Sequence, residues 1–180
     1  MLEKNIREQI IELIHQQVVP AVGCTEPMAV ALCTARATEL LGQRPEHISV
    51  LLSANILKNA MGVGIPGTGM IGLPIAIALG ALVGKSEYQL EVIKDLTPVT
   101  LEAGKTFISE NRIDVKLKEG ITEKLYIEIT CEAEGHSATA IISCAHTNIV
   151  FEEKDGNVLL DKMQPSTTTE EKAPLCLSLK

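Results

Sequence analysis

The stretch KLYIEITCEAEGHSATAIISCAHTNIVFEEKDGNVLL, residues 124–160, decides the fold class. It is made of short runs in which Ile, Val and Thr alternate with polar residues, the pattern of β-strands. Asp155-Gly156 separates two of these runs and predicts a hairpin turn. Residues 111–163 are therefore predicted to form a small antiparallel β-subdomain. Its expected strands are 113–118, 124–133, 137–144, 148–152 and 158–160.

The sequence before this stretch contains mostly helical patterns. The predicted helices are residues 6–18, residues 25–41 with Thr25 as N-cap, residues 73–83, and residues 90–109, which Pro98 must kink or split. The predicted fold class is α+β, with an N-terminal helical part (1–110) that contains a glycine-rich loop and one strand at 47–53, followed by the β-subdomain. Residues 164–180 are low in apolar content and resemble a linker.

Composition excludes several function classes. The net charge of -7 and the pI of about 5.1 offer no basic surface for a phosphate backbone, so nucleic acid is not an expected partner. Residues 60–84 carry no charge, but prolines and glycines interrupt them, so a buried turn and core helix are expected rather than a membrane span. The N-terminus has no signal-like apolar region, and the 5 cysteines show no CxxC spacing. A cytoplasmic protein with reduced thiols is expected.

Cys24 lies in Gly23-Cys24-Thr25-Glu26-Pro27, just before the helix predicted at residue 25. The positive end of a helix dipole favours the thiolate, which suits a metal ligand or a nucleophile. A small buried residue at a helix entry is the alternative interpretation. A papain-like nucleophile would need a positioned histidine, and His146 is the one in a polar setting. Glu26 is a general-base candidate or a routine partner of the helix dipole.

A glycine-rich loop, Gly62-Val-Gly-Ile-Pro-Gly-Thr-Gly69, follows the polar side chains of Asn55, Lys58 and Asn59. Gly62, Gly64 and Gly67 match the G-x-G-x-x-G fingerprint of dinucleotide-binding loops. However, no hydrophobic strand leads into the first glycine, so a nucleotide site is not expected. Its backbone N–H groups could still hold a small anion such as a substrate carboxylate. Lys58 is a candidate clamp for that carboxylate or an ordinary solvated charge.

Four motifs, taken together, resemble the L-cysteine desulfidase family, which is related to the alpha chain of iron-sulfur L-serine dehydratases. They are Pro20–Pro27, Ser53–Asn59, Gly62–Pro74 and His146–Val150. The resemblance implies a [4Fe-4S] lyase that converts L-cysteine to pyruvate, ammonia and hydrogen sulfide. Three cysteines of such a family hold the cluster, and one open iron acts as a Lewis acid on the substrate.

The resemblance covers only the N-terminal half of that family. It implies that Cys24 is the first cluster ligand and that the other two ligands lie in a C-terminal half that this chain does not contain. The isolated chain is therefore expected to be inactive without a C-terminal partner chain. The resemblance and the polar settings suggest catalytic roles for Lys58 and His146. The expected substrate contacts are Asn55, Asn59, Thr68, Thr147 and Asn148.

Other functions stay open at this point. The chain is alternatively a noncatalytic small-molecule-binding or interaction subunit, or part of an L-serine dehydratase-type enzyme. A homo-oligomer is possible, and a small amino acid such as L-cysteine is the expected small-molecule partner. Apolar surface left uncovered near residues 61–73 would favour partner binding.

Overall fold

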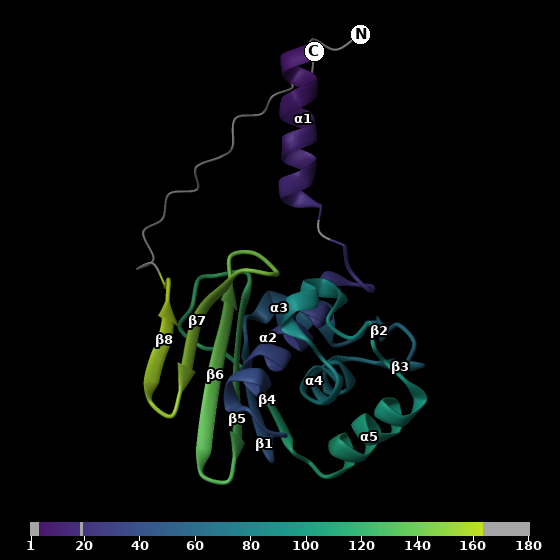
Figure 1. Cartoon of the computed structure of the whole chain (residues 1–180), viewed down its shortest axis with the longest axis vertical. Helices are drawn as coiled ribbons and strands as arrows, with labels where there is room; N and C mark the ends of the chain where they lie inside the picture. The colour runs from purple at the N-terminus through teal and green to yellow at the C-terminus, as the bar shows by residue number, and fades with distance from the viewer. Residues whose placement is uncertain (1–3, 19, 164–180) are drawn as a thin grey trace. The chain divides into compact units, whose positions relative to one another are not determined.

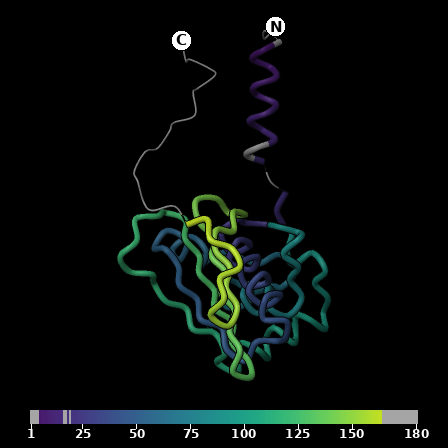
Figure 2. The backbone as a smooth tube through the Cα atoms, turned by 60° about the vertical axis from the view of Figure 1, so that its left-hand side comes forward, coloured from purple at the N-terminus to yellow at the C-terminus, as the bar shows by residue number. Residues whose placement is uncertain are grey.

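The computed structural model describes residues 4–18 and 20–163. The strands of its main sheet are β1 (His47–Leu52), β4 (Ile113–Leu117), β5 (Tyr126–Ala133), β6 (His136–Ser143), β7 (Ile149–Lys154) and β8 (Asn157–Asp161). They lie in the order β4-β1-β5-β6-β7-β8, so the chain's described part ends on an edge strand, drawn yellow in Figure 2. The helices are α1 (Lys4–Gln17), α2 (Thr25–Leu41), α3 (Ala54–Ala60), α4 (Leu73–Leu82), the short 3-10 helix η1 (Ser86–Glu91) and α5 (Pro98–Ser109). The predicted α+β class is confirmed.

Strands β5 to β8 pair antiparallel, as expected for the β-subdomain, and the sheet as a whole is mixed. β1 pairs with β4 in parallel, whereas it pairs with β5 in the antiparallel sense. A parallel pair needs a long crossover, and here the chain passes through α3, α4, η1 and α5 between the two strands. The strand before residue 110, β1, and the strands after it therefore belong to one sheet. The domain boundary at that residue stays a prediction.

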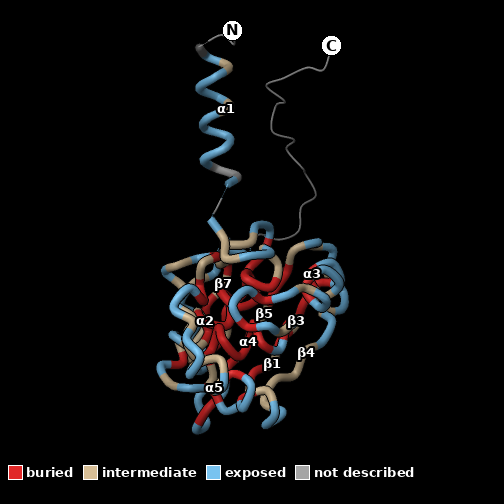
Figure 3. The backbone as a smooth tube through the Cα atoms, turned by 90° about the vertical axis from the view of Figure 1, so that its right-hand side faces the viewer, coloured by how far each residue is buried: buried red, intermediate tan, exposed pale blue. Residues whose placement is uncertain are grey.

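The residues from Ala21 to Met163 form one compact unit in which helices stack on one side of the sheet (Figure 1). α2 packs against β5, β6 and α4, and α4 packs against α5. Buried residues, red in Figure 3, concentrate in α2, in α4 and on the facing strands. With only 2% aromatic residues, close helix packing depends on small residues. Gly104 of α5, for example, lies close to Ile75 and Leu79 of α4.

Local sequence signals explain where several elements begin and end. Pro98 splits the predicted helix 90–109, because α5 starts at this proline and Thr97 caps it in a capping box with Thr100. Asp155 and Gly156 both have positive φ, 50° and 80°, as the hairpin turn between β7 and β8 requires. The uncharged segment 60–84 becomes a turn and the ten-residue α4. None of the helices in the described ranges has the length and apolar character to cross a bilayer.

α1 belongs to a separate unit and is considered by itself. It forms where a helix was predicted for residues 6–18, and its apolar residues recur at helical spacing from Ile6 to Ile14. Ile11, Leu13 and Ile14 are exposed. The linker predicted for residues 164–180, which includes Cys176, lies outside the described residues.

Candidate functional site: the Cys24 turn

Cys24 itself, rather than Thr25, is the N-cap of α2. Its thiol is exposed, and its backbone is extended with φ -66° and ψ 136°. Gly23 before it has φ +109°, and a Cβ at this position would lie 2.7 Å from Cγ of Pro66. Only glycine fits such a conformation without strain. The turn that carries Cys24 is thus packed against the glycine-rich loop, so two distant sequence motifs meet.

The Cys24 thiol is held by the carboxylate of Glu26. Sγ donates a hydrogen bond to Oε2 of Glu26 at 3.1 Å. This hydrogen bond raises the pKa of Cys24 above its ordinary value, and partial burial and the negative charge of Glu26 act in the same direction. Backbone N–H groups of residues 25 and 26 favour the thiolate but are outweighed. The helix N-terminus thus favours the thiolate, as predicted, but the Glu26 carboxylate opposes it.

Glu26 lies in the first turn of α2 and accepts hydrogen bonds from the Cys24 thiol and the Thr25 hydroxyl. Partial burial alone would raise the pKa of the Glu26 carboxyl, but hydrogen bonds from Cys24, the Glu26 backbone N–H and the Thr25 hydroxyl lower it. A positive charge on the half-buried His146 contributes to the same lowering and is the smallest of the named causes. Cys24 and Glu26 are therefore joined by a hydrogen bond, whereas His146, which is distant in sequence, acts on the same carboxylate through its charge.

Predicted substrate contacts of the β6–β7 loop are largely engaged in shaping that loop. The side-chain amide of Asn148 donates to the backbone oxygen of Ser143 at 2.9 Å. Thr147 is half-buried in the same turn. Cys144, directly after β6, is exposed and has φ +69°. That conformation turns the chain out of β6 at the start of the loop that carries His146.

Thr68 holds the turn of a short hairpin inside the glycine-rich loop, between β2 (Gly64–Ile65) and β3 (Met70–Ile71). Its buried hydroxyl donates to the backbone oxygen of Ile65 at 2.7 Å and accepts from the backbone N–H of Met70 at 2.9 Å. The Thr68 hydroxyl is thus engaged within the turn. Its role as a substrate contact stays a prediction.

Asn55, Lys58 and Asn59 are exposed on α3, which packs against α2. Ser53 caps this helix: its hydroxyl accepts from the backbone N–H of Ile56 and donates to the backbone oxygen of Lys124 at 2.8 Å. Asn55 lines a hollow of about 450 Å³ beside the loop at residues 117–124. Among the described residues, no hydrogen bond or ion pair joins these three side chains to Cys24 or His146.

The described part of the chain contains no group of three His, Cys, Asp or Glu side chains that could hold a metal ion. Cys33 and Cys131 are buried in the core. Burial raises the pKa of the Cys131 thiol to about 12 and that of Cys33 well above its ordinary value. Neither is a ligand for an ion at Cys24. A metal centre at Cys24 would therefore need its other ligands from outside the described residues.

Comparison with known proteins gives the chain close relatives. A UPF0597 protein of Bacteroides fragilis is 66% identical over 99% of the chain and 42% of its own length. A UPF0597 protein of Phocaeicola vulgatus is 66% identical over 95% of the chain and 40% of its own length. One of Porphyromonas gingivalis is 50% identical over 96% of the chain and 40% of its own length. The chain is similar to UPF0597 proteins. It spans about 40% of the length of these relatives.

These comparisons correct one prediction. Relatives that match nearly the whole chain carry the name UPF0597 protein and not that of an L-cysteine desulfidase, so the predicted membership in the L-cysteine desulfidase family is wrong. The UPF0597 name states no substrate or cofactor. No family model matches the chain, and no solved structure matches it.

The Glu26 carboxylate should control the reactivity of Cys24. In a Glu26→Gln variant the negative charge is lost, so the pKa of the Cys24 thiol should fall toward its ordinary value. Alkylation by iodoacetamide at mildly alkaline pH should therefore become roughly threefold faster. This gain is smaller than the gain in thiolate, because a less basic thiolate is a weaker nucleophile. The rate is measured in a Cys144→Ser, Cys176→Ser background. An unchanged pH profile would show that Glu26 does not hold the thiol.

Proposed function

We propose that this chain forms one part of the active site of an iron-sulfur-dependent lyase that converts L-cysteine to pyruvate, ammonia and hydrogen sulfide. Cys24 serves as one ligand of a [4Fe-4S] cluster, and the remaining ligands come from a C-terminal partner segment. The single observation that carries the proposal is the Cys24 turn: an exposed thiol at the N-cap of α2, hydrogen-bonded to a carboxylate.

The Glu26 carboxylate supports a ligand role for Cys24. A cysteine must lose its proton to bind iron, and Glu26 already accepts that proton in a hydrogen bond of 3.1 Å. The raised pKa keeps the thiol protonated, and so less reactive, until a metal displaces the proton. Metal binding should therefore become stronger as the pH rises toward the pKa of the Cys24 thiol.

The proposal requires ligands from outside the described residues, because these contain no three-ligand group. The described residues alone therefore do not fit a cubane cluster. The relatives extend well beyond the part that this chain matches, which leaves room for the other ligands. An iron with an open position would supply a Lewis acid for the departing sulfur of the substrate.

Within this chain, His146 and Lys58 are the proposed catalytic side chains. The charge of His146 acts on the Glu26 carboxylate, and an imidazole and a carboxylate together could exchange a proton with a substrate. Lys58, exposed on α3, is proposed to attract the substrate carboxylate. The free thiols of Cys24 and Cys144 are consistent with a cytoplasmic location, which forms part of the same proposal.

The test uses a joined polypeptide in which residues 1–180 precede the remaining length of the Bacteroides fragilis relative. It is reconstituted anaerobically with iron and sulfide, and sulfide release from L-cysteine is measured, with L-serine as a second substrate. Cys24→Ser should abolish the brown chromophore and lower the rate about 100-fold or more, since even outer-shell partners of a metal site contribute 10–100-fold.

Cys144→Ser is the matched control, because Cys144 is a second exposed thiol that the proposal does not use. It should keep both the chromophore and the rate. Sulfide release by the joined polypeptide without iron, or by the Cys24→Ser variant at an unchanged rate, would contradict the proposal. If pyruvate is released from L-serine but not from L-cysteine, the substrate is L-serine instead of L-cysteine.

A further inference from the structure

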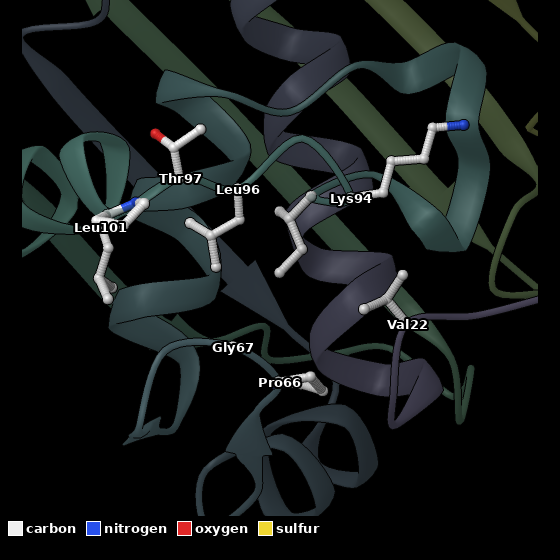
Figure 4. Close-up of a pocket in the computed structure, with 9 residues that line it drawn as sticks. Val22, Pro66, Gly67, Lys94, Leu96, Thr97 and Leu101 are labelled. Carbon is white, nitrogen blue, oxygen red and sulfur yellow. The ribbon is translucent and has the colours of Figure 1, made fainter.

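A groove of about 360 Å³ lies between the turn of the β2–β3 hairpin and the start of α5. Its lining includes Val22, Pro66, Ile93, Leu96 and Leu101. Figure 4 shows Val22 and Leu96 directed into the same hollow from opposite sides, with Pro66 below them. Apolar side chains from three separate parts of the sequence thus converge on one surface depression.

The polar side chains at the groove are engaged elsewhere. The amine of Lys94 extends away from the hollow in Figure 4 and lies 3.5 Å from the centre of the Tyr88 ring. The hydroxyl of Thr97 accepts from the backbone N–H of Thr100 in the cap of α5. A small polar ligand such as an amino acid would therefore find few free partners here. The groove suits apolar side chains of a protein segment.

Exposed apolar residues also lie on α5 and on or next to the β2–β3 hairpin, the two elements that border the groove. Val99, on the first turn of α5, is 79% exposed. On the hairpin side, Ile71 is 68% exposed and Met61 is 55% exposed. These two are close to each other, because a Cβ on Gly72 would lie 2.8 Å from the backbone oxygen of Met61. A hollow flanked by large exposed apolar side chains is typical of a protein interface.

The groove also adjoins the Cys24 turn. Val22 lines it two residues before Cys24, and Pro66 contacts Gly23 directly before the cysteine. The backbone N–H of Val22 donates to the backbone oxygen of Leu90, which fixes the turn on the body of the fold. A segment seated in the groove would therefore pass beside Cys24.

We infer that this groove is the docking site for an apolar segment from the part of the UPF0597 relatives that this chain does not span. The chain covers 42% of the Bacteroides fragilis relative at 66% identity, so most of the relative's length lies beyond the matched region. This inference rests on the proposed function, since the same segment would bring the missing ligands to Cys24. Val22, Pro66 and Leu101 anchor the segment, and Val99 and Ile71 extend the contact.

The test measures protection of single cysteines against maleimide. Lys94→Cys or Leu101→Cys is placed in a background in which Cys24, Cys144 and Cys176 are serine, and labelling is compared between the chain alone and the joined polypeptide. A thiol covered by a docked segment reacts only on local opening, so labelling should slow about tenfold or more in the joined polypeptide. Val158→Cys, on the exposed face of β8, should label equally in both.

The outcomes distinguish a failure of the docking inference from a failure of the proposed lyase activity. Equal labelling at residues 94 and 101 overturns the docking site, even when sulfide release succeeds. Protection in the labelling variants, combined with no chromophore and no sulfide release from the joined polypeptide that retains Cys24, keeps the docking site and overturns the lyase. Protection in the chain alone that grows with its concentration overturns the inference, because a second copy is then the occupant. If the joined polypeptide does not fold, the same cysteines at the aligned positions of the Bacteroides fragilis relative decide the question.

Discussion

Phe107→Ala should lower the free energy of unfolding by about 3–5 kcal/mol, the range for removing a fully buried phenylalanine. Phe107 is completely buried on α5 and is the largest fully buried side chain in a chain with only 2 phenylalanines. The guanidinium groups of Arg44 and Arg112 lie 5.4 and 5.7 Å from its ring centre, so truncation also removes two cation–π contacts. Urea denaturation followed by circular dichroism measures the loss.

Val99→Ala is the matched control for this prediction. Val99 lies on the same helix but is largely exposed, so its truncation should change stability by no more than about 0.5 kcal/mol. A similar loss from both variants would mean that α5 is not packed through Phe107. The two variants together separate core packing from helix propensity.

Gly80→Ala should destabilise the protein by about 3 kcal/mol even though alanine is the better helix former. A Cβ on Gly80 would lie 2.5 Å from the backbone oxygen of Ala31 and 3.1 Å from Cβ of Thr34, both on α2. Alanine would gain about 1 kcal/mol in helix propensity, but α2 and α4 would have to move apart in the centre of the core. The steric cost of the clash with α2 should therefore exceed the gain in helix propensity.

Gly62→Ala is the control for Gly80→Ala. No atom lies within 4 Å of a Cβ built on Gly62, and its φ is not in the left-handed region. Stability should stay the same or rise by a few tenths of a kcal/mol, because alanine restricts the unfolded chain. Thermal unfolding of both variants under identical conditions gives the comparison. Equal melting temperatures would contradict the close approach of α2 and α4.

Local signals in the sequence predicted most elements of this fold. The alternating runs after residue 112, Pro98 at the start of α5 and Asp155-Gly156 at a hairpin turn each act over a few residues. The parallel pairing of β1 with β4 depends on partners more than 60 residues apart, and no short pattern encodes it. The mixed character of the sheet was therefore missed.

The site was predictable only in part. Cys24 was identified because its position at a helix start follows from local pattern, and Thr68 was singled out because it is a polar residue among glycines. Local pattern could not show that the Thr68 hydroxyl holds a turn. It also could not show that the Glu26 carboxylate accepts a hydrogen bond from Cys24, or that the charge of His146, which lies far away in the sequence, acts on this carboxylate.

The burial of α2 has a consequence for how an assembled site would form. α2 packs against both the sheet and α4, so its amides should exchange with deuterium only when the whole unit from Ala21 to Met163 opens. Cys24 caps this helix and is thus attached directly to an element that is packed on two sides. Conformational adjustment during assembly would then fall on the arriving segment, while the sulfur of Cys24 stays a fixed point of attachment.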